Sequence, residues 1–178
     1  MGLYDVMLTD DGFVQKDDLS YPFEERGLQF GDGVYEVIRI YEGSYYLLKE
    51  HVERLYRSMS AIKITPPFSE TEMYAYLDDL LERNGVTSDA KLYLQVTRGS
   101  APRNHEFPLE TGVNLYAYVK DFPRNTDLMR NGVSTITLED IRWEWCYIKS
   151  LNLLPNVIAK QEAKEHGARK RSSTKTDW

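Results

Sequence analysis

The stretch VYEVIRIYEGSYY, residues 34–46, decides the fold of this chain. Valine, isoleucine and tyrosine fill most of it, and these residue types are enriched in β-strands. Glu42-Gly43-Ser44 breaks the run, and a short polar break that contains glycine is typical of a tight turn. The stretch therefore predicts a β-hairpin, to which the neighbouring segments must add further strands and covering helices.

Two amphipathic helices are expected after the hairpin. Apolar residues recur at helical spacing from Val52 to Ile62, and Pro66-Pro67 ends that pattern. Ser69 and Glu72 then have the spacing of a capping box at the start of a second helix, which Asn84-Gly85 closes. Each helix has one apolar face, as a helix that covers a sheet requires.

Two more strands are predicted from strict alternation of apolar and polar residues, over 92–97 and over 113–119. A long polar loop, Arg98 to Gly112, separates them. The segment KDFPRNTD, residues 120–127, then interrupts the pattern with a proline and polar residues, so it is the predicted linker between two domains.

Beyond the linker the sequence predicts one strand, one helix and a tail of different composition. Residues 133–138 predict a strand, and 150–165 predict a helix in which Pro155 is tolerated because it lies in the first turn. After Gly167 the chain reads ARKRSSTKTDW, without apolar periodicity and with four basic residues against one aspartate. This tail differs in composition from everything before it.

Composition excludes several classes of protein. The 178 residues suit one domain, or one domain and part of another, and the net charge of -6 argues against a nucleic-acid partner. No signal peptide or membrane-spanning stretch is recognisable. The single cysteine, Cys146, favours a reducing cytoplasm, and the three scattered histidines have no metal-ligand spacing. We expect a cytoplasmic globular protein without a metal.

A few side chains could carry chemistry. Lys149 is flanked by Cys146, Ile148 and three leucines, and such an apolar neighbourhood would lower the pKa of its amine and favour a nucleophile, although most lysines are solvated surface charges. Arg98, Arg103 and His105 share one loop and could bind a carboxylate, or could simply be solvated.

Two other features allow only simpler interpretations on the residues alone. Arg54 lies beside the apolar face of the first helix, where a lone arginine is usually a solvated charge. Gly31-Asp32-Gly33 resembles the start of a dinucleotide loop, but Glu36 occupies the place of the third glycine and a strand follows, so a glycine turn is the better interpretation.

Four separated motifs nevertheless occur in order along the chain. They are LQFGDGVYE at 28–36, HVERL at 51–55, VTRGSAPRNH at 96–105, and DIRW at 140–143 with IKSLN at 148–152. Together they closely resemble bacterial D-amino-acid aminotransferases, a family of the branched-chain-aminotransferase-like, fold-type-IV pyridoxal phosphate enzymes. The resemblance runs in register from near residue 2 to about Gly167.

The resemblance implies roles for individual residues. Lys149 would bind the cofactor, pyridoxal 5'-phosphate, through its amine and move a proton at the substrate α carbon. Arg54 would bind the cofactor phosphate, to which a forked guanidinium is suited. Tyr35, Arg103 and His105 would bind the substrate carboxylate, with the two loop residues supplied by the partner subunit of a homodimer.

The implied reaction is amino-group transfer from D-amino acids such as D-alanine to 2-oxoglutarate, so the expected partners are D-amino acids and 2-oxo acids. The Arg103-Asn104-His105 pattern favours this reaction over those of the sister families, the branched-chain aminotransferases and the aminodeoxychorismate lyases. Specificity between these families depends on one loop.

The resemblance also implies the domain organisation. We expect an α+β fold: an N-terminal antiparallel-sheet domain with helices over 1–120, a linker over 121–127, the beginning of a mixed α/β, barrel-like cofactor-binding domain over 128–167, and a non-matching tail over 168–178. The strand, glutamate and serines that follow in the family are not recognisable in the tail. We therefore expect a truncated chain with impaired catalysis; the alternative is a non-catalytic fragment able at most to dimerise.

Overall fold

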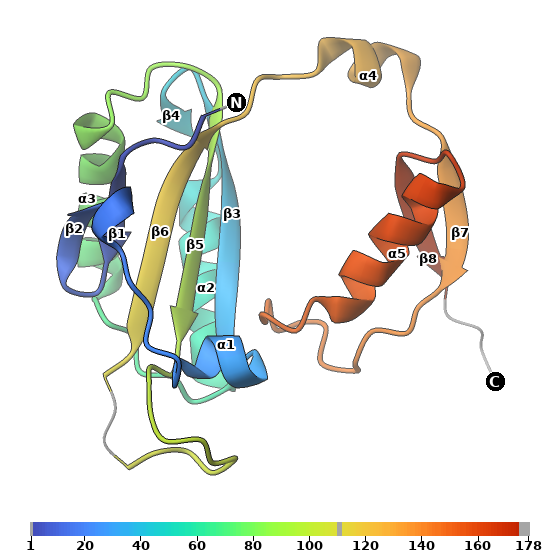
Figure 1. Ribbon diagram of the computed structural model, residues 1–178. Coiled ribbons are helices and arrows are strands. Elements are labelled where there is room, and N and C mark those ends of the chain that lie inside the picture. Colours follow the sequence, from blue (N-terminus) through green and yellow to red (C-terminus); the bar gives the residue numbers. More distant parts are fainter. Residues whose placement is uncertain (1, 110–111, 175–178) are drawn as a thin grey trace. The chain divides into compact units, whose positions relative to one another are not determined.

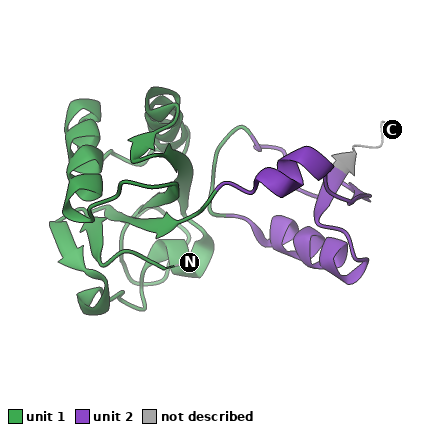
Figure 2. Ribbon diagram, turned by 90° about the horizontal axis from the view of Figure 1, so that it is seen from above, with its two compact units in different colours: residues 1–123, 147–151 green, residues 124–146, 152–178 purple. Residues whose placement is uncertain are grey.

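The computed structural model describes residues 2–109 and 112–174, and these form two compact units. The first unit comprises Met1–Pro123 together with Tyr147–Leu151, and the second comprises Arg124–Cys146 and Asn152–Trp178 (Figure 2). The division after Pro123 falls inside the segment 121–127. The segment Tyr147–Leu151 differs from expectation, because the sequence placed it within the second domain and the structure groups it with the first.

The first unit is built on a six-stranded sheet with the strand order β2-β1-β6-β5-β3-β4, in which every neighbouring pair is antiparallel. Its strands are β1 (Val6–Thr9), β2 (Gly12–Gln15), β3 (Gly33–Tyr41), β4 (Ser44–Tyr45), β5 (Ala90–Thr97) and β6 (Asn114–Asp121). The predicted hairpin is confirmed as β3 and β4. Glu42 and Gly43 form its turn with φ of 49° and 78°, the positive values that a tight hairpin turn needs.

Helices α2 (Leu48–Ala61) and α3 (Glu70–Arg83) pack on one face of this sheet (Figure 1). Both were predicted from their apolar spacing, and the capping box of Ser69 and Glu72 is present. The core between helices and sheet contains fully buried side chains from both layers, among them Ile38, Leu55, Leu77 and Leu92. The α+β class with an antiparallel sheet is therefore confirmed.

Four elements of the first unit escaped prediction: strands β1 and β2, the 3-10 turn η1 (Lys16–Asp18) and helix α1 (Arg26–Phe30). In α1 the Glu25 carboxylate accepts the Leu28 N–H at 2.8 Å, and Gly31 ends the helix in the left-handed conformation with φ of 65°. The glycine-turn interpretation of Gly31-Asp32-Gly33 is thus correct.

The second unit contains α4 (Thr126–Asn131), β7 (Thr135–Glu139), α5 (Leu154–Glu165) and β8 (Lys170–Thr174). Strands β7 and β8 pair in parallel, and α5 packs on both. The strand predicted over 133–138 is confirmed as β7. Within the described residues, no helix has the length and apolar character needed to cross a membrane.

Two expectations about this second unit need correction. Helix α5 begins at Leu154 and not at Ser150, because Ser150 is engaged in an antiparallel bridge with Val34 of the first unit's sheet. No helix or strand is predicted after Gly167, yet residues 170–174 form β8. A strand rich in serine and basic residues gives no apolar alternation, so the sequence pattern could not indicate it.

Candidate active site

Lys149 lies in a short extended segment that adds to the beginning of β3. The Tyr35 N–H donates to the Lys149 carbonyl at 2.9 Å, and the Leu151 N–H donates to the Gly33 carbonyl at 3.0 Å. Gly33 has no side chain at this crossing, where a Cβ would lie 2.8 Å from the Leu151 side chain. The backbone of Lys149 is therefore fixed against the residues of the predicted site on β3.

The amine of Lys149 lies over the Tyr35 ring, with Nζ 4.1 Å from the ring centroid. Among the described residues, neither Nζ nor the Tyr35 hydroxyl has a hydrogen-bond or ion-pair partner. The expected apolar neighbourhood is only partly present, because Ile148 is buried whereas Cys146 is exposed. Lys149 and Tyr35 thus offer two adjacent unpaired polar groups.

Arg54 lies on α2 and is oriented by a carboxylate that the sequence analysis missed. Its Nε and Nη2 donate to the two oxygens of Glu36, each at 2.6 Å, and Nδ1 of His51 lies 2.8 Å from the same carboxylate. Glu36 is fully buried, and its hydrogen bond is the main reason why the pKa of Arg54 is raised. Within the described part of the chain, Nη1 of Arg54 has no partner.

Ser58 connects the arginine to the lysine. It lies four residues after Arg54 on α2, so both side chains project from the same face of the helix. The Lys149 N–H donates to the Ser58 hydroxyl oxygen at 3.4 Å. Three of the predicted site residues, Tyr35, Arg54 and Lys149, are therefore brought together within the first unit.

The two other predicted residues, Arg103 and His105, lie elsewhere in the same chain. Both are exposed, and both pack against Phe30 of α1: the Arg103 Cζ is 4.9 Å from the centroid of that ring, and the His105 ring centroid is 5.4 Å from it. No contact joins either of them to Tyr35 or Lys149 among the described residues.

The predicted cationic pocket of Arg98, Arg103 and His105 needs correction, because Arg98 is engaged elsewhere. Its guanidinium donates to both oxygens of Asp32, at 2.9 and 3.0 Å, and to the carbonyls of Ile62 and Lys63. Its side chain is 8% exposed. With these contacts Arg98 closes the end of α2 and has a structural role.

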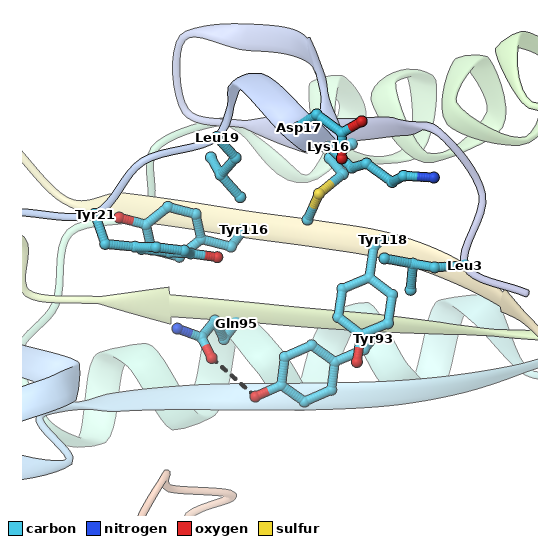
Figure 3. A pocket seen from close by; sticks show the side chains of 10 residues that line it. Leu3, Lys16, Asp17, Leu19, Tyr21, Tyr93, Gln95, Tyr116 and Tyr118 are labelled. Carbon is cyan, nitrogen blue, oxygen red and sulfur yellow. Dashed lines mark hydrogen bonds between the residues drawn. The ribbon is translucent and has the colours of Figure 1, made fainter.

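A cavity of about 480 Å³ lies on the opposite face of the sheet from α2 and α3, and Figure 3 shows its lining. Tyr93, Tyr116 and Tyr118 form its floor, and the Tyr93 hydroxyl donates to Gln95 at 2.8 Å. Burial raises the pKa of Tyr93 to about 12. None of the predicted site residues lines this cavity, although Tyr35 stacks on Tyr93 with 5.9 Å between ring centroids.

The sequence pattern of one family, described as amino-transferase class IV, matches residues 33–172. The chain belongs to this family. The match includes β3, α2 and the segment that contains Lys149, so Tyr35, Arg54 and Lys149 all lie within the matched part of the chain. The match extends through the first residues of β8. The resemblance noted from four motifs is thereby confirmed.

Individual proteins of known sequence or structure are also similar to this class IV chain. It is 46% identical over 167 residues to the D-alanine aminotransferase of Listeria innocua, with 91% of this chain and 57% of that protein covered. The chain therefore spans little more than half the length of this relative. A branched-chain aminotransferase from Thermoproteus uzoniensis matches 98% of this chain and 61% of its own, with a TM-score of 0.85 and 20% identity.

A hypothetical aminotransferase from Mycobacterium tuberculosis, in its PLP-bound form, has a TM-score of 0.82 and 22% identity. It covers 97% of this chain and 62% of its own length. At these identities the solved structures show that the class IV chain shares their fold.

Proposed function

We propose that this class IV chain takes part in pyridoxal phosphate-dependent transfer of an amino group between D-amino acids, D-alanine among them, and 2-oxo acids such as 2-oxoglutarate. One observation carries the proposal: the unpaired amine of Lys149 is held over Tyr35, in the same unit as an arginine whose Nη1 has no partner in the described residues. A single cysteine supports a reducing compartment, the cytoplasm.

The residues present fit the cofactor. Lys149 provides an amine that is half-buried and has no partner among the residues described, and Arg54 provides a guanidinium that Glu36 holds from one side. A phosphate is well suited to the remaining N–H donors of such a forked group. When bound, pyridoxal phosphate supplies a ring that withdraws electrons from the substrate α carbon.

The side chains of this chain have distinct tasks in the proposed reaction. Lys149, whose Nζ lies over the Tyr35 ring, would hold the cofactor through that amine and would move the proton at the substrate α carbon. Arg54 binds the phosphate and fixes the end of the cofactor away from the reacting carbon. Tyr35 offers its hydroxyl to the substrate carboxylate.

The D-amino-acid preference is supported by the relatives, since the D-alanine aminotransferases of Listeria innocua and Bacillus licheniformis are 46% and 45% identical to this chain. The branched-chain enzymes are similar at 18% to 20%. Among the described residues no contact joins Arg103 or His105 to Lys149 of the same chain, as expected for a homodimer in which the loop of one subunit completes the site of the other.

The experiment uses the purified chain with added pyridoxal phosphate. We expect a visible absorption band that borohydride abolishes, and no such band from Lys149→Ala. Lys49→Ala, which changes an exposed lysine of α2, should keep the band. Absence of the band in the unaltered chain would contradict the proposal and favour the non-catalytic alternative.

A substrate panel then tests specificity. With 2-oxoglutarate as acceptor, D-alanine should convert the band and L-alanine, L-leucine and L-isoleucine should not. Reaction with the L-amino acids alone would replace the proposed specificity with that of a branched-chain aminotransferase.

A further inference from the structure

A second buried arginine lies outside the set of residues discussed so far. Arg26 of α1 is 3% exposed, and its Nε donates to Asp32 at 2.9 Å. Asp32 is already paired with Arg98 through both oxygens, so its charge is balanced without Arg26. Because Asp32 does not need Arg26 for charge balance, the burial of the Arg26 guanidinium must be stabilised by another contact.

That contact is visible at the other end of the guanidinium. Nη1 of Arg26 donates at 2.7 Å to the carbonyl of Asn104, a residue 78 positions away in the loop after β5. The main chain of the same segment also holds the start of this loop, because the Arg26 N–H donates to the Gly99 carbonyl at 2.9 Å. Figure 1 shows α1 at the end of the sheet where β5 gives way to the loop.

The pinned carbonyl lies between the two residues expected to bind the substrate carboxylate. Arg103 and His105 flank Asn104, and both rest on the ring of Phe30, which Arg26 itself approaches at 4.9 Å. In the described residues neither Arg103 nor His105 has a hydrogen bond or an ion pair. Their donors are therefore held in place by ring contacts and stay available to an anion.

We propose that Arg26 and Phe30 are positioning residues, which fix the conformation of residues 103–105 so that Arg103 and His105 present their donors to a carboxylate together. This inference rests on the proposed function for the identity of the ligand. It holds for whichever subunit's site the loop serves, because α1 and the loop belong to the same chain.

Two variants separate this role from a general loss of folding. Arg26→Met leaves Asp32 paired with Arg98, and Phe30→Leu removes the ring that Arg103 and His105 contact. We expect either change to lower the backbone NMR order parameters of residues 103–106 from the rigid range of about 0.85 to the flexible range below about 0.6, because the loop loses a charge-assisted hydrogen bond or a comparable contact. The order parameters of β3 and β5 should stay unchanged. Phe23→Leu, at an exposed ring near α1, should alter neither region.

Ligand binding supplies the second readout. On the chain loaded with pyridoxal phosphate, both variants should weaken the Kd of propionate by about tenfold, while the Kd of pyridoxal phosphate and that of the uncharged analogue propionamide stay constant. Unchanged order parameters at 103–106, or lower order parameters with unchanged propionate binding, would overturn the inference. Failure of the unaltered chain to bind pyridoxal phosphate would instead refute the proposed function, and the order parameters would still decide whether α1 holds the loop.

Discussion

Two arginine–carboxylate pairs of the first unit have the same chemistry and different surroundings. Arg98 with Asp32 is enclosed, with side-chain exposures of 8% and 13%, and its guanidinium also binds two carbonyls. Arg54 with Glu36 has a fully buried carboxylate and an arginine that is 41% exposed. In the first pair the guanidinium is engaged on all sides, whereas in the second one side remains open.

The difference gives a criterion for the role of a paired arginine: an arginine in a structural ion pair uses all of its guanidinium donors, whereas one that can bind a ligand keeps some of them free. Glu36 fixes the plane of the Arg54 guanidinium through two hydrogen bonds, and the remaining donors then point away from the carboxylate. Arg98 joins Asp32 to the end of α2 instead. Variants at both pairs can test whether one stabilises the fold and the other binds the cofactor.

The largest expected effect is on stability. Arg98→Met should lower the free energy of unfolding by about 3 kcal/mol, because Asp32 loses its two bonds to Arg98 and keeps only the one to Arg26, and two carbonyls lose their donor. Urea denaturation followed by circular dichroism measures this change. Arg57→Met, at an exposed arginine on α2, is the matched control and should have little effect. A loss as small as that of the control would remove the distinction between the two pairs.

The second prediction concerns cofactor binding. Arg54→Lys keeps the positive charge and loses the forked donor group, so the Kd of pyridoxal phosphate should rise by about tenfold while the unfolding free energy falls by only about 1 kcal/mol. A titration followed by the visible band gives the Kd. Pyridoxal, which lacks the phosphate, serves as the control ligand and should bind both proteins equally. An equal loss for both ligands would show that Arg54 does not act on the phosphate.

The smallest expected effect is at His51, the third member of the Glu36 cluster. His51→Gln removes one hydrogen bond to a carboxylate that keeps both of its bonds to Arg54, so unfolding should become easier by about 1 kcal/mol. The Kd of pyridoxal phosphate should change by no more than about threefold, less than 1 kcal/mol of binding free energy. A larger rise in Kd would place His51 beside Arg54 as a determinant of cofactor binding.

The elements that the sequence predicted are those with a local signal. Helices α2 and α3 and strands β3, β5 and β6 have apolar residues at regular spacing, because one face of each is buried in a single core. Helix α1 has only five residues and buries Glu25 and Arg26 at its start, so it has no apolar period to detect.

The site was predictable only through family motifs. Lys149 and Tyr35 are far apart in the sequence and meet through backbone pairing, for which no local pattern exists. In the sequence Glu36 only takes the place of a glycine in a possible dinucleotide motif, and its pairing is not visible because its partner Arg54 lies 18 residues later on another element. The sequence groups Arg98 with its loop neighbours, because the carboxylate that it binds, Asp32, lies 66 residues earlier.

The grouping of Tyr147–Leu151 with the sheet unit has a practical consequence for anyone who divides this protein at its linker. A fragment that stops at Pro123 would keep the sheet, both covering helices and the Arg54–Glu36 pair, but the Lys149 amine would stay on the other fragment. The backbone groups at the start of β3 that pair with this segment would then be free to accept a strand supplied in trans. A synthetic peptide that spans 147–151 is the natural candidate, which makes this protein suitable for split-protein complementation around its lysine.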